Sequence, residues 1–249
     1  MTFPTRGTWC LAVFLATSLC GCSDTGDKPT GEGATPKAVA DKSTNRPQGN
    51  ADDKAGVEAA WTDFKKASLS GQGEIAAGRV TSATHDYYEE IRKLALEASR
   101  DELGKYVFMK RYTALGMRLR MPAEQLRSMS GRELFVYSVD QGWIGKNSAT
   151  DEGIGEITVT GDHARAVATK AGRPTRQYYH FVKKDGVWRL DMLQLMKFAN
   201  VAFDQMLQDS GMTEAQFTKR FLEATTGKTV TDDLWIPPDA EQPDEREPE

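Results

Sequence analysis

Three side chains on a predicted β-hairpin are placed to act together in proton transfer. The dipeptide Asp185-Gly186 is a strong signal for a two-residue turn. Counting outward from that turn sets His180 opposite Asp191, with Arg189 on the same face of the sheet. A carboxylate opposite an imidazole can fix the tautomer of the ring and favour general-base chemistry. No nucleophile accompanies the pair, so the spacing favours an ordinary cross-strand pair on an exposed or partner-facing side of the sheet.

The histidines and glycines give no complete metal or cofactor motif. His85 and Glu89 lie four residues apart on a predicted helix, a spacing that could hold a metal weakly, but a third ligand is not evident. Gly227-Lys228-Thr229 is similar to the end of a phosphate-binding loop, yet it lacks the first glycine and the strand that should precede it. The sequence therefore predicts no metal and no cofactor.

Positive charge is concentrated on one predicted helix, at Lys110, Arg111, Arg118 and Arg120. Such a cluster could dock anionic lipid headgroups or a partner protein. The simpler interpretation, which we favour, is a solvated helix face.

All three cysteines lie in the first 22 residues, at positions 10, 20 and 22. Disulfides, a thiolate nucleophile and cysteine-bound zinc are therefore excluded from the rest of the chain. Arg6 precedes an apolar run, Thr8 to Leu19, that is shorter than the roughly 20 residues that span a bilayer. This arrangement is typical of a signal peptide.

The apolar run ends in Leu19-Cys20-Gly21-Cys22, which resembles the lipobox of bacterial lipoproteins. The resemblance implies cleavage between Gly21 and Cys22 and attachment of acyl chains, such as palmitate, to Cys22. Two or more acyl chains hold a protein firmly to a membrane. The alternatives are a plain secretory signal cut near the same place, or a buried N-terminal helix. We therefore expect a lipid anchor in the cell envelope, outside the cytoplasm, on the periplasmic face or the cell surface.

Composition divides the chain into four segments. Residues 1–21 are the predicted signal peptide, and residues 22–53 are polar, contain no aromatic residue and are expected to form a disordered tether. Residues 54–230 are expected to form one α+β domain, and residues 231–249 an acidic, proline-rich tail. The formal charge of −4 gives no overall attraction to nucleic acid, so we expect no nucleic-acid partner.

Hydrophobic periodicity within the domain changes from helical to strand-like near residue 150. It predicts helices over about 55–70, 84–98 and 102–120 and from residue 131, the last with a capping box at Ser130 and Glu133. Strands are predicted over 154–160, 163–169, 175–183 and 187–194, with two helices after them. The fold class is therefore α+β: N-terminal helices packed on a curved antiparallel four-stranded sheet, followed by two C-terminal helices.

The last predicted hairpin carries a short signature of six residues: Phe181, Lys183, Asp185, Gly186, Trp188 and Leu190. In this order after helices, the signature is similar to that of the nuclear transport factor two-like and SnoaL-like superfamily. The resemblance covers about residues 57–195 and implies a cone-shaped fold with an internal pocket. The helical insert over 102–143 is longer than the family usually shows, and two helices follow the sheet.

The superfamily includes isomerases, dehydratases, cyclases and adaptor domains, so fold alone decides little about function. Our leading hypothesis is a non-enzymatic, membrane-anchored module that binds an envelope protein or a small apolar ligand. The alternative is an isomerase, dehydratase or hydrolase-type enzyme that uses His180 or a buried carboxylate in a cone pocket as its base. A third hypothesis is a structural envelope protein that acts through the convex face of its sheet.

Overall fold

The computed structural model describes residues 51–145 and 151–239. The predicted signal peptide, Cys22, the tether as far as residue 50 and the tail from residue 240 lie outside the described residues. No helix in the part of the chain that the structure describes is both long enough and apolar enough to cross a membrane.

The described residues form the predicted α+β fold. Along the chain, helices come before and after the four strands of one sheet. Before the sheet come α1 (Ala51–Leu69), α2 (Gly73–Gly78), α3 (Ser82–Glu97), α4 (Arg100–Leu103), α5 (Phe108–Arg120), α6 (Ala123–Ser128) and α7 (Gly131–Asp140). The strands are β1 (Glu152–Thr160), β2 (His163–Lys170), β3 (Arg173–Lys184) and β4 (Val187–Leu190). After them come α8 (Met192–Ser210), α9 (Glu214–Thr226) and a 3-10 helix (Asp232–Trp235).

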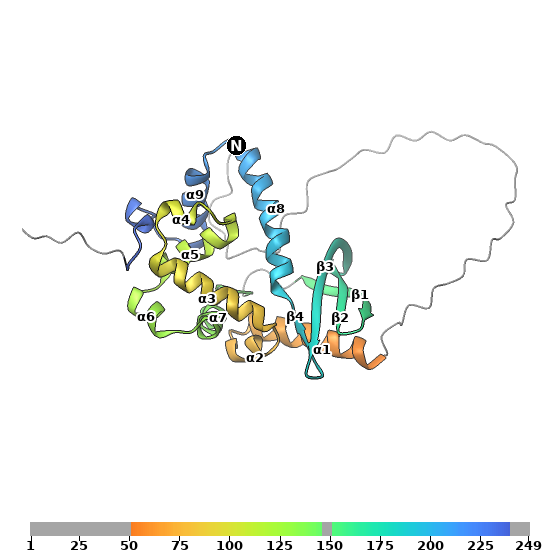
Figure 1. Ribbon diagram of the computed structural model, residues 1–249. Helices are drawn as coiled ribbons and strands as arrows, with labels where there is room; N and C mark the ends of the chain where they lie inside the picture. The colour runs from red at the N-terminus through yellow and green to blue at the C-terminus, as the bar shows by residue number, and fades with distance from the viewer. Residues whose placement is uncertain (1–50, 146–150, 240–249) are drawn as a thin grey trace, which may run out of the picture.

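The sheet is antiparallel in the order β1-β2-β3-β4 and is not closed into a barrel. Figure 1 shows the strands at one end of the molecule, with α1 running along their base and α8 rising beside β3. The remaining helices gather at the other end. The chain therefore places a helical body and a small sheet side by side, and α1 and α8 connect them.

The turn at Asp185-Gly186 has the geometry that the sequence predicts. Both residues have positive φ, 53° and 75°, as a two-residue turn of type I′ requires. The predicted pairing of Phe181 with Leu190 is confirmed. The strand β4 nevertheless ends four residues earlier than expected, because the Asp191 carboxylate accepts a hydrogen bond from the Leu193 amide and starts α8.

Two parts of one hydrophobic core support this arrangement. The inner face of the sheet packs on α1, where the ring of Trp61 lies 4.1 Å from that of Tyr179, centroid to centroid. Another part of the core joins α5, α8 and α9 through five aromatic rings: Phe108, Tyr112, Phe203, Phe217 and Phe221. Burial of such rings is the main source of stability in a domain without disulfides.

The ends of the described domain are ordered further than the sequence suggests. Helix α1 begins at Ala51, and Asp53 accepts hydrogen bonds from Lys183 Nζ (2.7 Å) and Trp188 Nε1 (3.2 Å). At the other end Leu234 is buried, and Asp239 pairs with Arg127. Parts of the predicted tether and of the predicted tail therefore belong to the folded body.

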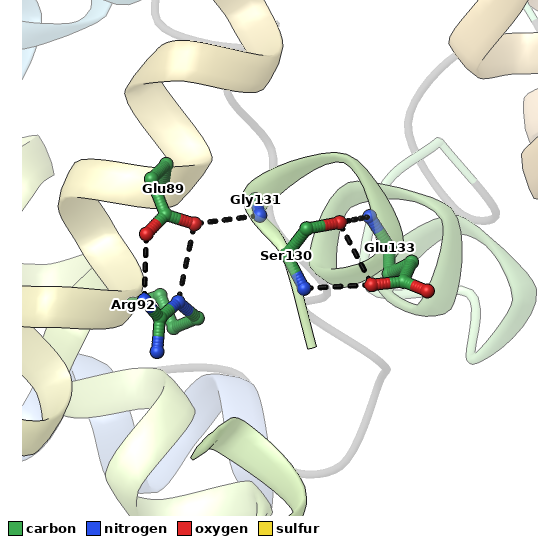
Figure 2. A network of polar contacts seen from close by, with 5 residues as sticks. All are labelled: Glu89, Arg92, Ser130, Gly131 and Glu133. Carbon is green, nitrogen blue, oxygen red and sulfur yellow. Dashed lines mark hydrogen bonds and ion pairs between the residues drawn. The ribbon is translucent and has the colours of Figure 1, made fainter. Parts of the chain in front are cut away.

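Helices α3 and α7 meet through a polar contact at the start of α7 (Figure 2). The backbone amide of Gly131 donates to the Glu89 carboxylate (2.8 Å), which also pairs with Arg92 (2.6 Å). Ser130 and Glu133 form the predicted capping box, each side chain accepting from the other residue's backbone amide. The negative charge of Glu89 thus lies at the positive end of the α7 dipole.

Gly131 cannot carry a side chain without disturbing this contact. A Cβ atom there would lie 2.3 Å from the Glu89 backbone nitrogen and 2.5 Å from the His85 carbonyl oxygen. We therefore expect Gly131→Ala to push α7 from α3 and to lower the free energy of unfolding by about 2 kcal/mol in a urea titration. At Gly78 an added Cβ meets nothing within 4 Å. Gly78→Ala should be neutral or stabilising, and equal losses in the two variants would contradict the account.

Candidate functional site

A buried glutamate lies between α1 and the start of the sheet. Glu152 is 6% exposed, and its carboxylate accepts a hydrogen bond from the Tyr179 hydroxyl at 2.6 Å. On α1, Trp61 packs on the Tyr179 ring, and one turn later Lys65 Nζ donates to the Glu152 backbone oxygen at 2.5 Å. Glu152 opposes Lys170 across β1 and β2. The group combines a carboxyl, a phenol and two ammonium groups within the inner face of the sheet.

Burial raises the pKa of the Glu152 carboxyl to about 7, although the Tyr179 hydrogen bond and the charges of Lys170 and Lys65 act in the opposite direction. Burial, together with the nearby Glu152, also raises the pKa of Tyr179. The Tyr179 phenol therefore stays protonated and donates a hydrogen bond to the Glu152 carboxylate, while the Glu152 carboxyl titrates near neutral pH. A pKa in this range suits a general acid or base.

This carboxyl is closed to a substrate in the structure. Glu152 is 6% exposed, Tyr179 is 2% exposed and Trp61, which covers the phenol ring, is 4% exposed. A reacting molecule would have to displace Trp61 or separate α1 from the sheet. The Glu152 carboxyl therefore has a pKa suited to a base, but a substrate cannot reach it in this structure.

The predicted candidates His180, Asp191 and Arg189 lie on the opposite side of the sheet. The Asp191 amide donates to the His180 carbonyl at 2.8 Å, so the predicted proximity of these two residues is present in the backbone. The Asp191 carboxylate, however, caps α8, and the Arg189 guanidinium donates to the Lys184 carbonyl at 3.0 Å. The structure therefore brings the three residues to one region of the sheet but directs two of the side chains to structural partners.

The side of the sheet turned away from α1, which we call the outer face, is exposed and basic. Strand register places these side chains on it: Thr158, Thr160, His163, Arg165, Val167, Tyr178, His180, Val182, Lys184, Val187 and Arg189. Arg165 opposes His180, and its guanidinium lies 5.2 Å from the centre of the Tyr178 ring. Within the described residues neither Arg165 nor Arg189 forms an ion pair.

Charge is distributed unevenly between the sheet and the rest of the chain. Residues 152–190 contain seven basic and four acidic residues, a formal charge of +3, whereas the whole chain has −4. Acidic residues in and around the strands include Glu156 on β1, the turn residues Asp162 and Asp185, and Asp191, whose backbone amide donates to the His180 carbonyl. The sheet is therefore a local basic surface on an acidic protein.

The basic residues of α5 do not form the docking face that their spacing suggests. Lys110 pairs with Glu90 at 2.7 Å, and Arg111 pairs with Glu214. Arg120 donates to the Gly116 carbonyl at 3.2 Å and lies over the Trp143 ring. Arg118 is largely withdrawn from solvent and donates to backbone carbonyls. The solvated helix face that we favoured is also wrong for these residues, because each is bound within the molecule.

The spacing of His85 and Glu89 serves the fold. Glu89 is bound to Arg92 and to the start of α7, and the His85 ring lies 6.0 Å from that of Phe135. Burial, followed by the charge of Arg132, lowers the pKa of His85. Among the described residues no three His, Cys, Asp or Glu side chains come close enough to hold a metal ion. The absence of a metal stays a prediction for the chain as a whole.

Sequence reasoning missed Glu152 as a site residue. Its one signal is a charged residue at an inward position of the alternating pattern that begins β1. An irregularity in register between Ile154 and Ile157 breaks that alternation, so counting back from the hairpin turn does not reach Glu152. The partnership with Tyr179 joins strands separated by β2 and could not be read from spacing.

Comparisons of this chain with protein-family models, with curated proteins and with solved structures find no match. The sheet has two surfaces that bear on function: a closed inner face with a titratable carboxyl, and an exposed outer face that is basic and aromatic.

Proposed function

We propose that the chain is a lipid-anchored, non-enzymatic binding module of the cell envelope that works through the outer face of its sheet. One observation carries the proposal: the outer face is exposed and holds Arg165 and Arg189 without an ion-pair partner among the described residues. Arg189 donates to a backbone carbonyl and Arg165 lies against the Tyr178 ring, so no described carboxylate neutralises either cation, and both can pair with an anionic group of another molecule. The lipobox sequence and the cysteine-free remainder support the anchor at Cys22.

The anchor is tested by fractionating a bacterial host that produces the chain. We expect the wild type to stay with membranes through a high-salt wash, because several acyl chains on Cys22 do not exchange readily. Cys22→Ser should lose the wash-resistant fraction. Cys20→Ser is the matched control: it alters a neighbouring thiol and should leave the protein bound. Release of both variants, or of neither, would contradict an anchor at Cys22.

The enzyme hypothesis has one observation in its favour, the pKa of about 7 at Glu152. An enzyme of this kind must open the space around that carboxyl. Labelling of native protein with a water-soluble carbodiimide measures this opening. We expect Glu152 to be protected and the exposed Glu156 of the same strand to react. Labelling of both residues at similar rates would favour an accessible catalytic carboxyl over the binding module.

A further inference from the structure

The described chain begins in α1 at the β3–β4 hairpin, on the inner side of the sheet. Asp53, in the first turn of α1, contacts the inner-face side chains of Lys183 and Trp188, one pair away from the turn of the β3–β4 hairpin. The same hairpin contributes Val187 and Arg189 to the outer face. The segment that leads back to the predicted lipid anchor therefore leaves the domain on the inner side of the hairpin whose other side carries part of the basic surface.

The length of that segment limits how far the domain can lie from the membrane. The 28 residues between Cys22 and Ala51 span at most about 100 Å when fully extended. A bilayer surface is consequently always within reach of the domain, and the tethered arrangement gives it a high effective concentration. Anionic lipid headgroups are therefore the polyanion that the tether keeps within reach of the outer face.

The composition of the outer face matches a membrane interface. Arg165 and Arg189 offer guanidinium groups that bind phosphate through paired hydrogen bonds. Tyr178 is 43% exposed and Val187 is 37% exposed on the same face. Tyrosine favours the headgroup region, where its ring meets acyl chains and its hydroxyl meets water. Arg165 and Arg189 can therefore pair with lipid phosphates while the exposed Tyr178 ring enters the headgroup region.

We propose that the outer face docks on the anionic headgroups of the membrane to which Cys22 is anchored, so that the domain lies with its sheet against the bilayer. This inference rests on the proposed function and names the ligand of the same surface. Two contacts then hold the protein: the acyl chains provide attachment, and the sheet sets the orientation of the helical body. An acidic protein segment would be the competing ligand.

The test removes the lipid anchor so that only the face can bind. The chain from residue 22 onward with Cys22→Ser retains every described residue, and its sedimentation is measured with phosphatidylcholine vesicles that contain phosphatidylglycerol. We expect binding that is absent on phosphatidylcholine alone and that weakens as salt screens the charges. Each surface cation contributes about fivefold to such binding, so Arg165→Gln with Arg189→Gln should weaken it about 25-fold.

A matched control places the same change elsewhere. Lys219 and Arg220 are exposed on α9, at the other end of the molecule from the sheet (Figure 1), and form no ion pair within the described residues. Lys219→Gln with Arg220→Gln should leave vesicle binding within about twofold, since α9 lies away from the docked face and salt screens distant charges. Thermal melts of both double variants check that folding is retained.

Three outcomes would overturn the inference. These are equal binding to neutral and anionic vesicles, equal weakening by the two double variants, and binding to polyglutamate without binding to anionic vesicles. The last outcome would identify the face as a site for acidic protein. The vesicle assay uses protein without Cys22, so a negative result there does not bear on the lipid anchor. The fractionation experiment tests the anchor separately.

Discussion

Replacing Arg118 by leucine should lower the free energy of unfolding by about 4 kcal/mol, the largest loss that we expect from any single substitution here. Arg118 donates to the carbonyls of Ala95 (2.6 Å), Leu94 (2.9 Å) and Ala98 at the end of α3. It also donates to the Leu234 carbonyl at 3.2 Å. The variant loses four hydrogen bonds from a charged donor to partly buried carbonyls, each of which contributes about 1 kcal/mol or more; of the four acceptors, the Leu94 carbonyl also accepts from the Ala98 amide.

Arg118 also connects three parts of the chain that are distant in sequence. It lies on α5, its main acceptors end α3, and Leu234 belongs to the C-terminal 3-10 helix. Burial lowers the pKa of its guanidinium to about 10, so the side chain still carries its charge at neutral pH. That charge compensates the negative end of the α3 dipole.

The measurement for Arg118 is urea-induced unfolding of the leucine variant beside a control. Arg220→Leu removes an exposed arginine from α9 and should change the free energy of unfolding by no more than about 0.5 kcal/mol. Arg118→Lys tests geometry separately, since a single ammonium cannot reach several carbonyls in one plane. Similar stability of Arg118→Leu and Arg220→Leu would contradict the assigned role.

The second large effect concerns pH and the carboxyl of Glu152. Its folded pKa, about 7, lies above the ordinary value of 4.5. Between these values the folded protein keeps a proton that the unfolded chain releases, so the folded state binds more protons. The titration of Glu152 therefore leaves the free energy of unfolding unchanged below about pH 4.5. It lowers that free energy by about 3 kcal/mol in total as the pH rises to about 7.

Glu152→Gln should remove this part of the pH dependence, because the amide stays neutral and can still accept from Tyr179. We expect the variant and the wild type to be similarly stable near pH 4.5, and the variant to gain about 3 kcal/mol relative to the wild type by pH 8. Chemical unfolding across this range gives the two profiles. Glu156→Gln controls for the loss of one carboxylate from β1. Parallel profiles of wild type and Glu152→Gln would show that the carboxyl does not titrate as the burial implies.

Local signals in the sequence predicted much of the fold, where neighbouring residues decide the conformation. Asp185-Gly186 determined the turn and with it the pairing of Phe181 with Leu190. Ser130 with Glu133 marked the start of α7. These features depend on contacts within a few residues, which a sequence pattern expresses directly.

Features that depend on packing between distant segments could not be read in the same way. The predicted helix over 102–120 is divided in the structure, because α4 ends at Leu103 and α5 begins at Phe108. Arg118 has the spacing of a surface residue, yet the C-terminal segment covers it. Glu152 is a candidate site residue because Tyr179 and Lys65, which are distant in the sequence, lie around it in the fold. In each case the deciding neighbour lies far along the chain.

The central claim, a module held outside the cytoplasm by acyl chains on Cys22, is tested most directly by the mass of the protein extracted from membranes. We predict a chain that begins at Cys22, lacks residues 1–21 and carries the added mass of a diacylglyceryl group. A chain that still begins at Met1 with an unmodified thiol at position 22 would contradict the claim.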